Sequence, residues 1–564
     1  MRVSEHLVSI LIRYGVRDAF GIPGGVLMQF LHDLEASKKI ALHLNYHEQA
    51  AAYAACGYAQ QSGKLCLAYA TKGPGICNMV TTIAEAYVDS IPVVFMTAHS
   101  GTINKKMRML DEQEIDIQQI TRNITKKTIR INNIEDANAK IEEACRLALT
   151  GRKGPVFIDI NTKVLMADIS DHITITGNSF KKDEYELKKD VLERIRADLK
   201  KATRPLILIG DGIRQAGVIE ELKEFVKFNN IPVLSSRCSQ DILKESKLYY
   251  GYIGSHATRY SNFILAKADL IISLGNRMAF PVESETYRKA LKNKKIIRVD
   301  IDGTEFNREI PNSVTVCADL ESVLHILKGE VFYYHKSDEW VRICDMIKES
   351  LWEADVNDIV DRMSNIIDQL PHGCTIVGDI GNNELWLSRA VAYSKNMNVF
   401  LCHSKAMKTV GCAIPKAIGC YYAKREPIVC ITGDQGAQFN IQELQYIALE
   451  HLPIKIIILN NLSSGMLRDY ERKKGYVKHI QTTLDSGYSS PNFENIARAY
   501  GIKYILLGGR KKEIRDAFEN KDPLIVEMDI DDEGIENPFI PRGNDCYNFE
   551  PQIEKGLYER LKKL

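Results

Sequence analysis

The chain has 564 residues, more than one hydrophobic core supports, so its length predicts about three domains. Its composition, 45% hydrophobic and 26% charged, is that of a globular protein, and no apolar run reaches the roughly 18 residues of a membrane span. The net charge of +1 argues against a nucleic-acid or membrane partner. The 13 cysteines form no CxxC pair, which argues against a zinc site or a disulfide framework and predicts a cytoplasmic protein.

The first predicted domain alternates β-branched runs with amphipathic segments, the pattern of a parallel sheet covered by helices. Charged residues interrupt the opening run, MRVSEHLVSILIRYGV, and no small-residue cleavage site follows, so it predicts an amphipathic helix rather than a signal peptide. Strands are expected in KLCLAYATKGPG, IPVVFMTA and GPVFIDI. A polar, aperiodic stretch from about residue 164 to 190 is then expected to be a linker.

Two more domains of the same type follow. RPLILIGDGI opens the second, which ends at a polar segment around residues 329–345, and CTIVGDIGNNE opens the third. The predicted fold class is therefore α/β, with three doubly wound parallel-sheet domains over residues 1–165, 185–330 and 345–535. Residues 536–564 form an aperiodic tail after the last strand and are a candidate lid.

The most informative segment is GDQGAQFNIQELQYIALEHLPIKIIILNN, residues 433–461. A buried strand leads into Gly433 and Asp434, and a helix is expected to begin near Phe439. A second buried strand ends at Asn461, so both strand ends face one crevice at the carboxyl edge of the sheet. Helix N-terminal amides at such an edge favour a phosphate group.

Hard oxygen ligands lie at the same edge. Asp434, Asn461 and the backbone carbonyl of Ser463 would, with diphosphate oxygens, complete the octahedron that Mg²⁺ prefers. Taken alone, a Gly-Asp or an Asn-Asn pair is ordinary turn chemistry at a strand end. The two pairs together, about 25 residues apart with strand, helix and strand, are the thiamine-diphosphate signature and predict that cofactor with Mg²⁺.

Glu48 is the candidate catalytic residue of the first domain, where it opens the alanine-rich helix in NYHEQAAAYAACGYAQQSGK. Asn45 followed three residues later by Glu48 is close to a capping box, so the glutamate has an ordinary structural explanation. The functional alternative is a hydrogen bond from Glu48 to the aminopyrimidine ring of the cofactor, which promotes loss of the thiazolium proton. The motifs of the whole chain decide between the two.

Those motifs resemble the acetolactate synthase branch of the thiamine-diphosphate enzymes over nearly the whole chain. The first domain carries them in order, as FGIPGG, HEQAAAYAACGYAQQSGK, KGPGICN, AYVDSIPVVFMTA and EQEIDIQQITRNITKK, the last similar to the family's FQE segment. The third domain carries GNNELW, SKAMKTVGCAIPKAIG and NNLSSGM. The resemblance therefore favours the catalytic interpretation of Glu48.

The resemblance implies roles for individual residues. Gln113 would lie over the thiazolium, with Lys126 following it in the family's TK pair. The Lys408 carbonyl would meet the aminopyrimidine, and Val410 would be the apolar prop that bends the cofactor. The expected catalytic residues are Glu48 and Gln113; the expected cofactor-binding residues are Gly24, Gly25, Pro74, Asn382, Asn383, Lys408, Val410, Gly433, Asp434, Gln435, Gly436, Asn461, Ser463, Gly465 and Met466; the expected metal ligands are Asp434, Asn461 and Ser463.

The resemblance also implies a homodimer or homotetramer whose active sites lie between the first domain of one chain and the third domain of another. FAD is a candidate structural cofactor, because YIGSHATRYSN (252–262) matches the family's flavin-contacting segment and GDGI (210–213) its glycine-rich turn. The alternative is a middle domain that has lost flavin or binds another nucleotide. His47, His99 and His403 lie near the expected site, but they are interpreted as packing residues rather than as catalysts.

The sequence departs from the family where the second substrate would bind. The family's RFDDR-like segment ends in an arginine that grips the acceptor carboxylate, whereas RMAFP (277–281) keeps Arg277 and has Pro281 at the gripping position. Proline cannot form the bidentate pair that a guanidinium makes with a carboxylate. The further departures are Glu112 for phenylalanine, Tyr470 for tryptophan, and Lys405 and Lys408 for glycines.

These departures predict a carbonyl acceptor without a carboxylate. The chain is expected to decarboxylate a 2-keto acid, in the first instance pyruvate, and to transfer the acetyl unit to a nucleotide-linked keto sugar in carbohydrate biosynthesis. The alternatives are acetolactate synthase proper, which joins two pyruvates, a simple 2-keto acid decarboxylase or lyase, and a non-catalytic relative, against which the presence of Glu48, Asp434 and Asn461 argues. A nicotinamide dehydrogenase is set aside because no GxGxxG occurs with an acidic residue at the usual distance.

Overall fold

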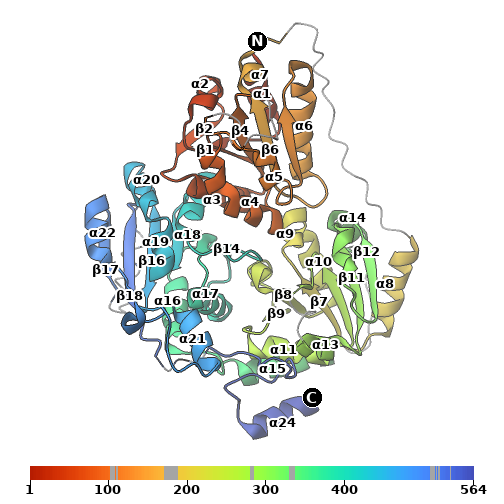
Figure 1. Cartoon of the computed structure of the whole chain (residues 1–564). Coiled ribbons are helices and arrows are strands. Elements are labelled where there is room, and N and C mark those ends of the chain that lie inside the picture. The colour runs from red at the N-terminus through yellow and green to blue at the C-terminus, as the bar shows by residue number, and fades with distance from the viewer. Residues whose placement is uncertain are drawn as a thin grey trace. The chain divides into compact units, whose positions relative to one another are not determined.

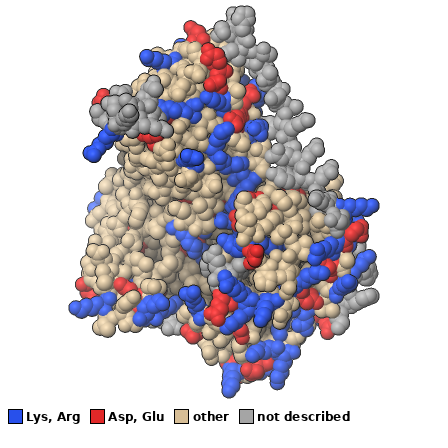
Figure 2. All heavy atoms as spheres, turned by 45° about the vertical axis from the view of Figure 1, so that its right-hand side comes forward, with Lys and Arg blue, Asp and Glu red and all other residues tan. Residues whose placement is uncertain are grey.

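Three six-stranded parallel sheets, each covered by helices, make up the computed structural model of the chain (Figure 1), which confirms the predicted fold class. The structure describes residues 1–101, 108, 112–169, 189–279, 285–328, 337–507, 515, 518, 521–533, 535 and 537–564. No helix in these ranges is long and apolar enough to cross a membrane. On the face drawn in Figure 2, basic and acidic side chains are interspersed, as the small net charge leads one to expect.

The first sheet has the order β2-β1-β3-β4-β6-β5. Its core is formed by apolar side chains from the strands, α1, α2 and α6. Its strands are β1 (Asp18–Gly21), β2 (Ala41–Leu44), β3 (Cys66–Tyr69), β4 (Val93–His99), β5 (Lys127–Ile131) and β6 (Val156–Asn161). Its helices are α1 (Val3–Arg13), α2 (Met28–Ser37), α3 (Glu48–Ser62), α4 (Pro74–Val88), α5 (Ile117–Thr121), α6 (Ile134–Leu149) and α7 (Thr162–Met166).

The second sheet has the order β12-β11-β10-β7-β8-β9. Its strands are β7 (Pro205–Ile209), β8 (Val233–Ser236), β9 (Tyr249–Ile253), β10 (Leu270–Leu274), β11 (Lys295–Asp300) and β12 (Ser313–Cys317). The helices in this part of the chain are α8 (Lys189–Lys201), α9 (Gly212–Ala216), α10 (Ile219–Asn229), α11 (Arg259–Lys267), α13 (Glu285–Leu291), α14 (Leu320–Leu327), α15 (Ser337–Leu351) and α16 (Asp358–Ile367).

The third sheet has the order β14-β13-β15-β16-β18-β17. Its strands are β13 (Cys374–Gly378), β14 (Val399–His403), β15 (Ile428–Gly433), β16 (Ile454–Asn460), β17 (Lys503–Leu506) and β18 (Leu524–Asp529). The accompanying helices are α17 (Asn382–Tyr393), α18 (Ala413–Lys424), α19 (Asp434–Phe439), α20 (Leu444–Leu449), α21 (Gly465–Lys473) and α22 (Phe493–Tyr500).

The chain divides into two compact units, each discontinuous in sequence. Unit 1 contains residues 1–183, 374–384 and 402–531, and unit 2 contains residues 184–373, 385–401 and 532–564. Unit 1 therefore combines the first sheet with most of the third. The predicted bounds of the three domains remain a prediction, and residues 170–188 of the predicted linker lie outside the described residues.

The predicted polar separator around residues 329–345 is partly wrong, because residues 337–345 belong to α15. Trp340 and Leu351 of this helix are buried in the same apolar cluster as Leu206 of β7, and the Trp340 indole N–H donates to the Pro205 carbonyl at 2.9 Å. The amphipathic spacing of α15 explains the error, since its polar face dominates the sequence while one apolar stripe packs in unit 2. Residues 329–336 are not described.

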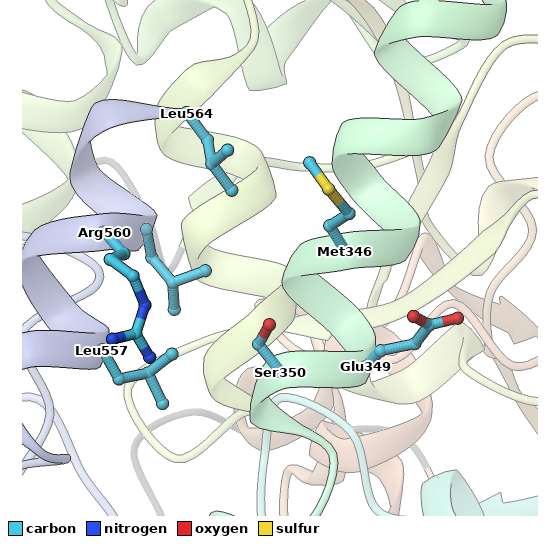
Figure 3. A pocket seen from close by; sticks show the side chains of 7 residues that line it. Met346, Glu349, Ser350, Leu557, Arg560 and Leu564 are labelled. Atoms are coloured by element: carbon cyan, nitrogen blue, oxygen red, sulfur yellow. The ribbon is translucent and has the colours of Figure 1, made fainter.

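The C-terminal tail is a structured part of unit 2 and ends in α24 (Lys555–Lys563). Its Cys546 and Leu561 are buried in the cluster that contains Trp340. α24 lies beside α15, and together the two helices line a shallow pocket of about 270 Å³ (Figure 3). The aperiodic sequence concealed this packing, and the role of the tail as a lid remains a prediction.

Helices α3 and α18 pack against each other in unit 1 (Figure 1), with backbone close to backbone. A Cβ on Gly419 would collide with the Ala54 carbonyl oxygen, and a Cβ on Gly57 would collide with the Lys416 carbonyl oxygen. Beside this contact, Lys416 of α18 forms a fully buried ion pair with Glu85 of α4. Helix α18 is thus held against α3 by shape and against α4 by charge, and removing either partner of the pair would leave an uncompensated buried charge.

We expect Gly419→Ala to destabilise unit 1 by about 3 kcal/mol or more, because rigid backbone rather than a side chain occupies the space. Thermal unfolding of the purified variant measures the effect. Gly303→Ala is the matched control, since its Cβ would meet only the Cys317 sulfur at an ordinary 3.7 Å. Equal melting temperatures for the two variants would contradict the close packing of α3 on α18.

Candidate active site

Glu48 is the first residue of α3 and lies at the carboxyl edge of the first sheet, just beyond β2. The helix is capped by His47, whose ring nitrogen accepts from the Gln49 N–H at 3.1 Å. Asn45 does not form the capping box that the sequence allows, because its amide donates to Glu443 at 2.8 Å. The Glu48 carboxylate instead accepts from the Asn78 amide at 2.9 Å. Its position is therefore fixed by a neighbour from α4 rather than by capping.

The N-terminus of α4 gathers other predicted site residues around Glu48. Pro74 is the first residue of α4, and a Cβ on the next residue, Gly75, would lie 3.3 Å from a Glu48 carboxylate oxygen. Gly73 has a φ of +65°, and a Cβ there would collide with the carbonyl oxygen of Gln113. Glu48, Pro74 and Gln113 are thus brought to one place, although each comes from a different segment.

The glycine-rich turn after β1 meets the same edge of the sheet. A Cβ on Gly24 would collide with the side chain of Thr71, which follows β3, whereas Gly25 has open space around its Cβ position. The backbone of this turn can therefore approach a ligand closely. The cofactor-binding roles of Gly24 and Gly25 remain predictions.

Glu114 is a buried site residue that the sequence interpretation missed. Its carboxylate accepts from the Ser100 N–H at 3.1 Å and from the Lys72 ammonium at 3.4 Å. These contacts anchor the backbone next to the exposed Gln113. The partners are 14 and 42 residues away in the chain, and no local spacing signals such contacts.

The other candidates near this edge have structural roles in the described contacts. His99 is bound by Asp159 at 2.7 Å and by Asn132 at 2.8 Å, which agrees with its interpretation as a packing residue. The Lys126 ammonium donates to the Thr150 carbonyl at 2.7 Å, just beyond the end of α6. These bonds account for His99 and Lys126 without a catalytic role.

Asp379, just after β13, organises the corresponding edge of the third sheet. One carboxylate oxygen accepts from the Ile380 and Gly411 N–H groups, each at 2.8 Å, and the other accepts from the Thr432 hydroxyl at 3.1 Å. Burial raises the pKa of Asp379. This carboxylate joins the ends of three neighbouring strands and was missed in the sequence. The signal was present, since Gly378-Asp379 repeats the Gly-Asp pair at residues 433–434.

The glycine-containing turn of residues 433–436, which we call the glycine cradle, lies beside Asp379. A Cβ on Gly436 would come within 2.7 Å of the Thr432 hydroxyl and 2.9 Å of Asp379, so a side chain there would force neighbouring atoms to shift. Asn383 donates to the Asp379 carbonyl at 2.8 Å, which turns its amide oxygen toward Gly433. Backbone N–H groups at the start of a helix, with no Cβ in the way, suit a diphosphate.

Asp434 is the first residue of α19, so the prediction that this helix begins near Phe439 is wrong; Phe439 is its last residue. Extended Gly433 caps the helix, and an acidic residue in the first turn is stabilised by the helix dipole. Asp434 is 2% exposed and accepts from the Tyr488 hydroxyl at 2.7 Å. Burial raises the pKa of its carboxyl to about 6. A cation would relieve the cost of ionising this buried group.

The loop after β16 brings the other predicted metal ligands next to α19. The Ser464 hydroxyl donates to the Gln435 side chain at 3.1 Å, which ties this loop to the residue after Asp434. Ser463, two residues after Asn461, is buried, and its hydroxyl accepts from Arg468 at 3.0 Å. Gly465 and Met466 follow at the start of α21.

The donor set at this edge fits Mg²⁺ with a diphosphate. It offers one carboxylate, one amide and one carbonyl, all hard oxygen donors, and leaves the remaining positions to phosphate oxygens or water. Within the described ranges no three His, Cys, Asp or Glu side chains gather as a metal cluster. The ligand roles of Asp434, Asn461 and Ser463 stay predictions.

The loop after β14 presents the predicted prop, Val410. Gly411 has a φ of +82°; its N–H donates to Asp379, and its carbonyl accepts from the Asn440 amide at 2.7 Å. Lys408 has a φ of +56°, a conformation that favours glycine. The loop is held from two sides, and the Val410 side chain is left 37% exposed. An apolar surface is therefore available beside the glycine cradle.

Glu443 of the third sheet's helical layer holds the residues just before Glu48. Its carboxylate accepts from the Asn45 amide at 2.8 Å and from the Tyr46 N–H at 2.9 Å. Burial raises the pKa of Glu443 to about 7, although these donors act in the opposite direction. The position of Glu48 thus depends on a residue almost 400 positions further along the chain.

We expect wild-type stability to fall relative to Glu443→Gln as pH rises from about 4.5 to about 7. The folded carboxyl keeps a proton that the unfolded chain has lost in this window, and the difference reaches at most about 3 kcal/mol. Urea unfolding of both proteins at about pH 5 and about pH 7.5 measures it, with Glu450→Gln as an exposed control. If the free energies of unfolding of wild type and Glu443→Gln changed equally with pH, the raised pKa of Glu443 would be contradicted.

The candidate flavin site lies in unit 2, at the crevice between β7 and β10. The sheet reverses its direction of growth there, which is where open α/β sheets bind ligands. Gly210 and Gly212 pack directly on the backbone of Gly275. Arg277 forms an ion pair with Glu305 at 3.0 Å. Pro281, on which the acceptor hypothesis depends, lies outside the described residues.

Comparison with known proteins identifies the family to which the chain is similar. Residues 1–120 match the N-terminal thiamine pyrophosphate binding domain of the thiamine pyrophosphate enzymes, residues 192–327 the central domain, and residues 379–528 the C-terminal thiamine pyrophosphate binding domain. The chain is 29% identical over 558 residues to the acetolactate synthase isozyme 2 large subunit of Escherichia coli (strain K12), covering 96% of this chain and 98% of that protein. It is 31% identical over 553 residues to the acetolactate synthase large subunit of Lactococcus lactis, covering 96% of this chain and 94% of that protein.

The chain belongs to the thiamine pyrophosphate enzyme family. Within that family it falls in the acetolactate synthase branch, which also includes a relative 30% identical over 597 residues, the probable acetolactate synthase large subunit of Methanocaldococcus jannaschii. It is a thiamine-diphosphate-dependent carboligase of the acetolactate synthase type. The family prediction made from the motifs is confirmed.

Proposed function

We propose that this carboligase transfers the acetyl unit of pyruvate to a carbonyl acceptor without a carboxylate, a nucleotide-linked keto sugar. The observation that carries the proposal is the acceptor segment, residues 277–281. Its gripping position is Pro281, and its only arginine, Arg277, is engaged by Glu305. A carboxylate acceptor would lack the oriented guanidinium that the family uses.

The proposed roles of the site residues follow from their positions. Asp434, Asn461 and Ser463 hold Mg²⁺, and the glycine cradle around Gly436 receives the diphosphate. Bound thiamine diphosphate supplies the carbanion chemistry of decarboxylation. Glu48, oriented by Asn78, hydrogen-bonds the aminopyrimidine, while Val410 sets the bend of the cofactor.

We further propose a homodimer or homotetramer, with each active site formed between the first domain of one chain and the third domain of another, and a cytoplasmic location. The exposed apolar side chain of Leu467, which is not among the predicted cofactor-binding residues, supports an assembled site, because a partner chain would cover it. FAD bound at the crevice between β7 and β10 is part of the proposal. Flavin absorbance of the purified protein tests it.

The acceptor is tested by incubating the enzyme with pyruvate, thiamine diphosphate and Mg²⁺, and identifying products by mass spectrometry. We expect little acetolactate from pyruvate alone, and an acetyl-branched product when a nucleotide-linked keto sugar is added. The control is Pro281→Arg, which restores the guanidinium and is expected to raise acetolactate formation. Robust acetolactate formation by the wild type at ordinary pyruvate concentrations would contradict the proposal.

The second candidate is acetolactate synthase proper. The names of the relatives from Escherichia coli and Lactococcus lactis favour it. In that case the wild type condenses two pyruvates in a rebuilt acceptor site. The same product analysis distinguishes the two candidates.

A further inference from the structure

A cationic segment begins in the last turn of α21 and continues beyond the helix, in the same part of the chain as the predicted cofactor-binding residue Met466. Four basic residues, Arg472, Lys473, Lys474 and Lys478, fall within seven positions, and all four are exposed. The whole chain has a net charge of only +1, so this density of positive charge is local. We call residues 470–479 the basic loop.

The basic loop is held in a defined shape by Glu471. Its carboxylate accepts from the His479 ring at 2.8 Å, from the Ile480 N–H at 3.0 Å and from the Thr482 hydroxyl at 2.7 Å. Gly475, with a φ of +72°, forms the turn between the two arms. The segment therefore returns on itself, and its four basic residues are exposed.

The base of the basic loop is attached to the predicted cofactor site. The Ser464 N–H donates to the Thr482 carbonyl at 2.9 Å, and the Ser464 hydroxyl donates to Gln435 at 3.1 Å. Gln435 is the neighbour of Asp434, so two hydrogen bonds connect the loop to the predicted metal ligand. The base of the loop is therefore hydrogen-bonded to the segment that carries the predicted metal ligand.

Exposed aromatic rings accompany the charges. Tyr470 is 55% exposed and Tyr476 is 60% exposed, and the Lys474 ammonium lies 5.7 Å from the centre of the Tyr470 ring. Cations bind phosphate oxygens, and aromatic faces stack on nucleobases, so the pair is the chemistry that recognises a nucleotide. Pyruvate has neither phosphate groups nor a base, and the diphosphate of the cofactor is proposed to bind elsewhere, in the glycine cradle around Gly436.

We infer that the basic loop is the subsite for the nucleoside diphosphate of the acceptor, with Arg472, Lys473 and Lys474 binding the phosphates and Tyr470 or Tyr476 stacking on the base. The inference rests on the proposed function and deepens it. Contacts with the nucleotide end of the acceptor would then supply binding free energy that the family's arginine–carboxylate pair would otherwise supply.

The test measures nucleotide binding without turnover. Holoenzyme saturated with thiamine diphosphate and Mg²⁺, so that the cofactor cradle is filled, is titrated calorimetrically with ADP, CDP, GDP and UDP. We expect at least one to bind, and the triple variant Arg472→Ala/Lys473→Ala/Lys474→Ala to weaken that binding about tenfold, since each exposed charge contributes a few-fold. Raising the salt concentration should weaken wild-type binding more than variant binding.

The matched control is Lys200→Ala/Lys201→Ala/Lys227→Ala, which removes three exposed cations from α8 and α10 in unit 2. It should bind the nucleotide as the wild type does. Equal binding by the loop variant and the control would overturn the inference, as would failure of all four nucleotides to bind at millimolar concentration. Of the single variants Tyr470→Ala and Tyr476→Ala, one should bind the four nucleotides with more similar affinities than the wild type does.

The proposed acceptor and the proposed role of the basic loop are contradicted by different results. Transfer to a nucleotide-linked keto sugar, with unchanged nucleotide binding in the loop variant, overturns the loop's role and leaves the proposed function standing. Robust acetolactate formation from pyruvate alone contradicts the proposed acceptor and, with it, the assignment of the loop as an acceptor subsite.

Discussion

Glu48→Gln is expected to lower pyruvate decarboxylation by at least about 100-fold, because an amide cannot accept and return the proton that the carboxylate manages. Glutamine preserves the size of the side chain, and it can still accept the hydrogen bond from Asn78 that fixes the position of Glu48. The variant should therefore fold normally and still bind the cofactor. Carbon dioxide release, measured at saturating thiamine diphosphate, gives the rate.

Two measurements separate chemistry from folding in this variant. Cofactor affinity, followed by fluorescence quenching or calorimetry, should change little, because the proposed diphosphate cradle lies at the edge of the third sheet. Glu35→Gln replaces an exposed glutamate of α2 and should retain full activity. A Glu48→Gln protein with more than half of the wild-type rate would remove Glu48 from the mechanism.

Asp434→Asn is expected to abolish tight binding of Mg²⁺ and thiamine diphosphate, and activity with it. The substitution removes the only carboxylate of the proposed ligand set while keeping the hydrogen bond from Tyr488. Without cofactor, the variant should be as stable as the wild type or more stable, because a buried carboxylate with a raised pKa carries a desolvation cost that the amide lacks.

Thermal unfolding with and without cofactor measures both effects. Wild type gains stability on binding, by an amount that grows with the ratio of ligand concentration to Kd, and the variant loses this gain. Asp485→Asn, on an exposed turn of unit 1, is the control and should keep it. A cofactor-induced rise in melting temperature that is equal in Asp434→Asn and wild type would exclude Asp434 as the metal ligand.

The sheets were predictable where inner strands are unbroken runs rich in β-branched residues, such as Ile428–Gly433 and Ile454–Asn460, whereas the buried inner strand Asp18–Gly21 has no β-branched residue and was not predicted. The short edge strands Ala41–Leu44 and Lys503–Leu506 were not predicted. An edge strand is paired on one side only, and several residues of these two are exposed, so the apolar run that marks a strand is absent. Helix α15 was mistaken for a separator for a related reason, since only one stripe of it is apolar.

The candidate site was predictable where one local motif carries the chemistry, as with Glu48 and Asp434. Asp379, Glu114 and Glu443 were missed, because each is defined by partners distant in sequence. Asp379 had a local signal, the repeated Gly-Asp pair, but its three hydrogen-bond donors come from separate segments of the chain. Glu114 and Glu443 have no such local signal.

The close contact between α3 and α18 has a consequence for the way the chain is made. Helix α3 ends at Ser62 and α18 begins at Ala413, so about 350 residues are synthesised between them, which takes roughly 20–70 s at 5–20 residues per second. During that interval the face of α3 that packs on α18 lacks its partner, whereas the rest of the helix can already pack on α4, β1 and β3. The growing polypeptide is therefore expected to depend on chaperones until the second helix leaves the ribosome.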